Sequence, residues 1–410
     1  MNTWIRNAAA ATVAVICGIG AGTAFAAPSN HTVREQIGKP LQQAEQLVKE
    51  KQYRKALELL TATSAVRDKS PYEEYAVDEV MAAAKIGSGD YAGAVQALKA
   101  VIATSVLPKD EALKRRLSIA QLEYQMKDYS GAVASAESYY QDGGTGVEAR
   151  RLMAQSYYLE NDYSDAANTI VAVINVEAHS GQPPDEALLL SLAESDYKIK
   201  NWHGYIDALE QLVASHPKHE YWIEVCQAVG QQPGFASRLR LDLDRLRASV
   251  GAMDTAEQFI TAAERALALG FPGDAKSFLR KGYAMGVLGK GPEAAREKRL
   301  VDLADRQSQE DMQGLPAQAD AANASNDGLA VEKLGEAYAS YGQYDTATKA
   351  LASSLKKGGL KYTEDAQLHL GVTDLAAGRT VQAREILNRV KGADGTEDLA
   401  RLWLIESTQH

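Results

Sequence analysis

Cysteine is almost absent from this 410-residue chain, which contains only Cys17 and Cys226. Cys17 lies in an N-terminal stretch that we expect to be removed, so no intrachain disulfide can form in the mature protein and packing must supply its stability. Phenylalanine and tryptophan are also scarce, with 5 and 4 copies, whereas tyrosine occurs 19 times. Cys226 follows Trp222 by four residues in an apolar segment, which predicts a buried helical position.

An excess of positive charge is missing as well. The chain has 44 lysine and arginine residues against 54 aspartate and glutamate residues, a formal net charge of −10. This balance argues against nucleic acid or an anionic membrane surface as the partner.

Sequence motifs for catalysis or metal binding are also lacking. No Gly-x-Ser-x-Gly, His-Glu-x-x-His or Cys-x-x-Cys occurs. His216 and His219 are one helical turn apart, but Pro217 intervenes and no carboxylate completes a ligand set. His369 is isolated in the sequence, which favours an ordinary interior or surface histidine. We therefore expect no catalytic residue, no metal site and no cofactor, and hence a protein that is not an enzyme.

Residues 1–26 have the features of a cleaved signal peptide. Arg6 precedes an apolar run from Ala8 to about Gly20, and Ala24-Phe25-Ala26 supplies small residues at a cleavage site. The apolar run is shorter than the ~20 residues that a membrane span needs. We expect export through the Sec pathway to the periplasm, with no membrane insertion after cleavage. An uncleaved membrane anchor is the alternative.

A short phrase recurs along the rest of the chain: a tyrosine, two variable residues and then alanine. The tyrosines of the phrase are Tyr53, Tyr91, Tyr129, Tyr163 and Tyr344. A repeat of 34 to 38 residues, the spacing of the first four, is one supersecondary unit that must stack on its neighbours to bury its apolar face.

Each repeat has the pattern of two amphipathic helices joined by a turn. In residues 147–173 the small side chains of Ala154 and Ala166 permit close helix approach, and Tyr163 is expected to fill the space between successive hairpins.

These segments resemble the tetratricopeptide-repeat family. The best copies are LGEAYASYGQYDTATKAL at 334–351 and AQSYYLENDYSDAANTI at 154–170, while LHLGVTDLAAGRTVQAREIL at 368–387 keeps the Leu-Gly pair without the aromatic residue. The resemblance covers Leu41 to about Pro217 and Leu329 to Leu387. It implies an all-α, right-handed solenoid of stacked antiparallel hairpins.

The pattern predicts four parts. They are the signal peptide at 1–26, an N-terminal array at 27–231, a divergent helical section at 232–327, and C-terminal repeats with a capping helix at 328–410. Within and beside the divergent section we expect a weak hairpin at 222–235, a charged helix at 237–250, and a helix from Pro292 that ends at Gly314-Leu315-Pro316. Residues 320–328 are expected to form a loop. Asp242 and Asp244 are expected on a solvated face.

Candidate binding residues lie on the first helices of three successive repeats. Aligning the repeats places an amide or acid at one position and a tyrosine one turn later, on the concave face: Gln121 with Tyr124, Gln155 with Tyr158, and Glu194 with Tyr197. Tyrosine and glutamine together suit an extended peptide. Arg151 is the candidate for an acidic partner group. The alternative, that the tyrosines only pack between hairpins, stays open.

The expected function is a non-catalytic scaffold that binds an envelope protein or peptide segment through the concave face. Two other roles stay open: an accessory or glycan-binding subunit of a polysaccharide export system, and an auxiliary protein of an inner-membrane energy-transducing complex. If the binding surface lies elsewhere, the charges around Arg238 to Arg247 are the second candidate.

The first prediction concerns processing. We expect cleavage after Ala26, because Ala24 and Ala26 are small and Phe25 occupies the unconstrained position between them. N-terminal sequencing of the exported protein checks this. A retained leader, or a mature protein that begins at Cys17, would contradict it.

Overall fold

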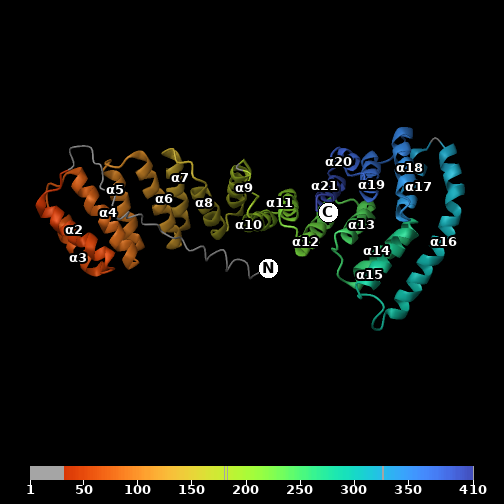
Figure 1. Cartoon of the computed structure of the whole chain (residues 1–410), viewed down its shortest axis with the longest axis horizontal. Coiled ribbons are helices and arrows are strands. Elements are labelled where there is room, and N and C mark those ends of the chain that lie inside the picture. Colours follow the sequence, from red (N-terminus) through yellow and green to blue (C-terminus); the bar gives the residue numbers. More distant parts are fainter. Residues whose placement is uncertain (1–31, 180, 182, 326, 410) are drawn as a thin grey trace. The chain divides into compact units, whose positions relative to one another are not determined.

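The computed structural model describes residues 32–179, 181, 183–325 and 327–409, and the predicted leader lies outside them. Every regular element in this part of the chain is helical, as predicted, and adjacent helices pair as antiparallel hairpins (Figure 1). None of the described helices combines the length and the apolar composition that crossing a membrane requires.

The chain divides into two compact units, which we call unit 1 (up to Ile199) and unit 2 (from Lys200). The division falls within the predicted N-terminal array, and the predicted boundaries near 231 and 327 stay predictions. The helices of unit 1 are α2 Glu35–Lys49, α3 Tyr53–Ser64, α4 Pro71–Ser88, α5 Tyr91–Ala103, α6 Lys109–Gln125, α7 Tyr129–Gln141, α8 Val147–Leu159, α9 Tyr163–His179 and α10 Glu186–Lys198. Each contacts its immediate neighbours along the chain, so unit 1 is an open array of hairpins.

The turn within each hairpin is set by local chemistry. Lys127 adopts a positive φ of 64°, which reverses the chain after α6. Asp128 then caps α7, and its Oδ1 accepts a hydrogen bond of 3.0 Å from the amide of Gly131. The aromatic residue that opens the second helix packs onto the next hairpin. The ring of Tyr53, for example, lies so close to Gly87 of α4 that a β-carbon there would come within 2.2 Å of it.

The alanine of the repeated phrase is fully buried in every copy. Ala56, Ala94, Ala132, Ala166 and Ala347 each have 0% exposed surface. A similar close approach explains the Leu-Gly pair, because a β-carbon on Gly335 would come 2.6 Å from Cγ of Leu351 on the partner helix. Small side chains therefore set the helix spacing, as the sequence predicts.

Unit 2 contains the remaining helices. They are α11 Trp202–Ser215, α12 His219–Gln231, the 3₁₀ turn η1 Ser237–Leu239, α13 Arg240–Ser249, α14 Ala256–Leu269, α15 Pro272–Ala284, α16 Ala294–Ala324, α17 Gly328–Ser340, α18 Tyr344–Lys357, α19 Thr363–Ala376, α20 Thr380–Leu387 and α21 Thr396–Glu406. Unlike unit 1, this unit closes on itself, because the last helix, α21, packs on α11 and α13. Arg401 of α21 donates a 2.8 Å hydrogen bond to Glu210 of α11.

Two sequence predictions about unit 2 are wrong. Residues 222–235 form most of a single helix, α12, instead of a hairpin. Helix α16 does not end at Pro316 but continues to Ala324, through the predicted start of the 320–328 loop. An internal proline costs ~3 kcal/mol. The continuation buries Leu315 and Ala322 against Val331 and Leu334 of α17, which offsets that cost.

The second prediction concerns hairpin packing. Replacing Ala166 or Ala347 with leucine forces the paired helices apart and should lower the free energy of unfolding by ~1–3 kcal/mol. Lys349→Leu is the control, because Lys349 is exposed on the same helix as Ala347. Thermal melts of the three variants check this, and equal shifts in Tm would contradict the packing described here.

Candidate functional site

The predicted binding positions occupy the same register on three helices of unit 1. Tyr124, Tyr158 and Tyr197 are the penultimate residues of α6, α8 and α10. The amide or acid of each pair lies three residues earlier, on the same face of its helix. Gln155 is exposed, whereas Gln121 and Glu194 are half-buried.

The three tyrosines differ in their surroundings. The Tyr124 ring meets the Tyr129 ring edge to face at a centroid distance of 5.5 Å, and Tyr158 meets Tyr163 in the same way at 5.6 Å. Tyr197 is 50% exposed. Tyr124 and Tyr158 thus have one side against the turn aromatic.

Two of the pairs lie next to each other. The Tyr158 hydroxyl of α8 lies near the Glu194 carboxylate of α10. Burial, then Glu194, raise the pKa of Tyr158 above its usual 10, so the hydroxyl keeps its proton at neutral pH. The structure therefore brings Tyr158 and Glu194 together and leaves the Gln155 side chain exposed beside them.

Arg151, the predicted contact for an acidic group, already has a partner. Its Nε donates a 2.9 Å hydrogen bond to Glu177 of α9, within the same hairpin. Its side chain is 35% exposed, so part of the guanidinium still faces solvent.

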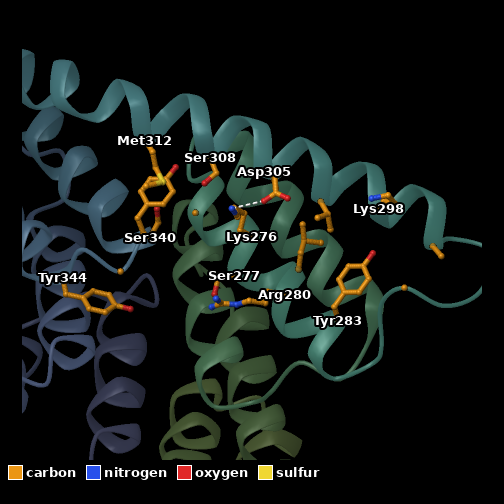
Figure 2. Close-up of a pocket in the computed structure, with 18 residues that line it drawn as sticks. Lys276, Ser277, Arg280, Tyr283, Lys298, Asp305, Ser308, Met312, Ser340 and Tyr344 are labelled. Atoms are coloured by element: carbon orange, nitrogen blue, oxygen red, sulfur yellow. Dashed lines mark ion pairs between the residues drawn. The ribbon is translucent and has the colours of Figure 1, made fainter.

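A groove in unit 2 was not predicted from the sequence. We call it the α15–α16 groove: it lies between these two helices, the α17–α18 turn closes one end, and its volume is about 880 Å³ (Figure 2). Lys276, Arg280 and Tyr283 line it from α15, and Lys298, Asp305 and Met312 line it from α16. In both helices these residues recur every three, four or seven positions, which places them on one face of each helix. This spacing is the sequence signal from which the groove could have been predicted.

Few of the polar side chains at the groove form ion pairs or hydrogen bonds with other side chains. Lys276 Nζ lies 2.9 Å from Asp305 Oδ1, an ion pair that joins α15 to α16. At the closed end, the Tyr341 hydroxyl donates a 2.7 Å hydrogen bond to Asp311. Arg280 is exposed and forms no ion pair with any residue that the structure describes.

A second unpredicted feature is a buried ionic cluster around α13, which we call the Arg245 cluster. Its members are Asp242 and Arg245 of α13, Asp274 of α15, Glu332 and Glu336 of α17, and His369 of α19. The Arg245 guanidinium lies 2.8 Å from Asp242, 2.7 Å from Asp274 and 3.0 Å from Glu336. His369 places Nε2 3.2 Å from Asp242 and Nδ1 3.3 Å from Glu332. Four helices are therefore joined through charged side chains.

The cluster favours the charged forms of Asp242 and His369, whereas burial raises the pKa of Glu336. Burial alone would raise the pKa of Asp242, but His369 and Arg245 hold it at about 2. Burial alone would lower the pKa of His369, but Glu336 and Asp242 outweigh it and hold this pKa well above 6.5. His369 is therefore an imidazolium between carboxylates at neutral pH.

The same residues include the ligand types of a metal site. Asp242, Glu336 and His369 offer ligand atoms that lie within 4.8 Å of one another. A metal ion between the two carboxylates would have to displace the guanidinium, since Nη1 of Arg245 contacts both Asp242 and Glu336. The arrangement therefore fits an ion-pair network better than a metal centre.

This cluster confirms one expectation from the sequence and corrects another. His369 is an interior histidine, as expected, and folding brings it to Asp242, 127 positions away in the sequence. Asp242 and Asp244 are not on a solvated face, since they are only 8% and 5% exposed. The charges of residues 238–247 are likewise used inside unit 2: Arg238 binds Asp365 at 2.6 Å. This stretch is therefore an internal element of unit 2.

The two neighbouring histidines and the cysteine that the sequence analysis considered have ordinary surroundings in the structure. His219 lies 3.1 Å from Asp254, and neither it nor His216 belongs to a metal-capable group in the described part of the chain. Cys226 is buried, as predicted, and desolvation raises the pKa of its thiol to about 12, so it stays protonated and unreactive.

The third prediction concerns pH. Because folding raises the pKa of His369, its contribution to stability is fully present below about pH 6.5 and is lost as the pH rises through the folded-state pKa, with a slope of up to about 1.4 kcal/mol per pH unit. Denaturant unfolding of the parent and of His369→Gln at several pH values tests this. The difference in unfolding free energy should be largest below pH 6.5 and shrink in alkali.

Tryptophan fluorescence suits this experiment, because Trp202, Trp222 and Trp403 all belong to unit 2 and the fourth tryptophan lies in the leader. The control is His219→Gln, which removes a histidine that is 55% exposed and lies outside the Arg245 cluster. A difference between parent and His369→Gln that does not vary with pH would contradict a charged His369.

Comparisons with known proteins find similarity to tetratricopeptide-repeat proteins. Residues 186–219 match the model of the tetratricopeptide repeat. A tetratricopeptide repeat protein from Parabacteroides merdae is similar at 14% identity, covering 66% of this chain and 99% of that one, with a TM-score of 0.35. The C-terminal part of a repeat-containing protein from Cytophaga hutchinsonii is similar at 15% identity over 63% and 98% of the two chains, with a TM-score of 0.34.

Comparison with curated proteins gives no match. The residues that match the family model contain the complete helix α10 and the complete helix α11. The resemblance predicted from the sequence is confirmed at residues 186–219, which match a tetratricopeptide repeat, and every regular element in the described part of the chain is helical.

Proposed function

We propose that this protein is a non-catalytic, exported scaffold that binds an extended segment of an envelope protein along the first helices of unit 1. Tetratricopeptide-type repeats are typically protein-interaction scaffolds, and the chain has that architecture. The export and envelope parts of the proposal come from the signal-peptide features of residues 1–26.

The observation that carries the proposal is the repeated register of the tyrosine positions on α6, α8 and α10. Three successive first helices present an aromatic ring with an amide or carboxylate one turn before it. An extended peptide offers alternating apolar side chains and backbone groups, and this surface matches both. Gln155 and Tyr197 are exposed, so they are accessible to a partner without rearrangement.

The packing of the tyrosine side chains makes this surface of unit 1 rigid. The edge-to-face packing of Tyr124 and Tyr158 on the turn aromatics holds these two rings in place, and the Glu194 carboxylate of α10 lies near the Tyr158 hydroxyl. A preorganised surface loses less conformational entropy when a peptide binds.

The fourth prediction tests this surface. A photo-crosslinking amino acid placed at Gln155 should capture an envelope protein in intact cells, and mass spectrometry identifies it. The same probe at Val171, which is 44% exposed on α9, is the control position. Replacing Tyr124, Tyr158 and Tyr197 together with alanine should abolish capture at Gln155, because the rings supply most of the apolar contact area.

Circular dichroism and thermal melts of the triple variant show whether a loss of capture reflects lost binding or lost folding. Helical content and Tm close to the parent are expected, and Val171→Ala with Val176→Ala serves as a matched loss of exposed apolar surface in the same unit. A triple variant that unfolds would show that the tyrosines are packing residues. A folded variant that still captures the partner would place binding elsewhere, and a partner from outside the envelope would overturn the proposed location.

A further inference from the structure

The α15–α16 groove has an electrostatic character opposite to that of the whole chain. Its lining includes Lys276, Arg280 and Lys298 against one acid, Asp305, whereas the protein as a whole carries a net charge of −10. Lys276 is neutralised by Asp305, but Arg280 has no acidic partner among the described residues, and Lys298 lies 3.5 Å from Asp302, with 76% of its side chain exposed. A negatively charged partner therefore gains attraction here that the rest of the surface opposes.

The same groove also exposes apolar surface. Met312 is 49% exposed and Tyr283 is 38% exposed. In Figure 2 these two side chains lie at separate places along the groove, with Lys276 and Asp305 between them. Exposed methionine and tyrosine side chains beside cations are typical of a surface that binds peptides.

The dimensions of the groove suit a short peptide. From Ala294 to Met312 the lining residues of α16 span about 27 Å at 1.5 Å per residue. An extended peptide of about eight residues covers that length at 3.3 Å per residue. Helix α16 has 31 residues, whereas its neighbour α15 has 13, so α16 provides a wall longer than an ordinary hairpin helix would.

From these observations we propose that the α15–α16 groove binds an acidic peptide segment that carries apolar side chains, with Arg280 and Lys298 holding its carboxylates and Tyr283 and Met312 contacting its apolar residues. A peptide fits better than a nucleic acid, because the groove has three cations, of which only Arg280 lacks a close acidic partner among the described residues, and nucleic-acid binding usually neutralises several phosphates. This site lies within unit 2 and does not depend on the tyrosine positions of unit 1.

Selection from a displayed library of random peptides about twelve residues long, carried out on the mature chain, tests the proposal. We expect the enriched peptides to be acidic and to contain apolar residues. Fluorescence anisotropy with labelled copies should show affinity that falls as salt increases. The double variant Arg280→Glu/Lys298→Glu should bind them about tenfold more weakly or worse.

A matched control removes the effect of total charge. Arg299→Glu/Arg306→Glu makes the same charge change at two exposed α16 positions that do not line the groove, and it should bind within about twofold of the parent. Thermal melts confirm folding of each variant, and Arg280→Gln/Lys298→Gln replaces the reversal if that variant is unstable.

Several results would overturn the proposal: no enrichment of acidic peptides, equal losses in the groove and control variants, or equal binding of a short single-stranded oligonucleotide that the groove variant abolishes. Peptides whose binding is lost only in the tyrosine triple variant of unit 1 would also overturn it while leaving the proposed function intact.

Discussion

The guanidinium of Arg245 bonds to carboxylates on α13, α15 and α17, and the architecture of unit 2 depends on keeping those three helices at that distance. Moving charged groups out of water is costly, and their mutual attraction repays this only when the partners are all in place. His369 adds α19 to the same arrangement. On its other faces α13 buries Leu243 and Leu246, so both its charged and its apolar sides are used internally.

This constraint gives the two units different surfaces. In unit 1 the main contacts join helices one or two apart along the chain, and the first helices keep polar and aromatic side chains that are at least partly exposed. In unit 2 the corresponding helices α17 and α19 turn Glu332, Glu336 and His369 toward α13. The accessible groove of unit 2 consequently lies on another side, between α15 and the long helix α16 (Figure 2).

Local features of the fold could be predicted from the sequence, and non-local ones could not. The hairpin turns and the buried alanines follow from spacing within about forty residues, which the repeat displays directly. The Arg245 cluster joins residues 127 positions apart, as in the pair His369 and Asp242, and no local pattern marks such a pair. The prediction that α16 ends at Pro316 was wrong for the same reason. A proline locally favours the end of a helix, but burial of Leu315 against α17 stabilises the continued helix. The tyrosine register was predictable, and the groove was hidden because its walls come from separate helices.

The contact between α11 and α21 determines when the folding of unit 2 can finish. Arg401 and Glu210 are 191 residues apart, so their bond closes a loop that contains nearly the whole of unit 2. Closing so long a loop is entropically costly, and chains dominated by such contacts fold slowly. Unit 1 needs no contact of this kind, and its hairpins can form one after another as the chain emerges. During synthesis α11 is made well before α21, so unit 2 lacks the contact between these two helices until α21 has been synthesised.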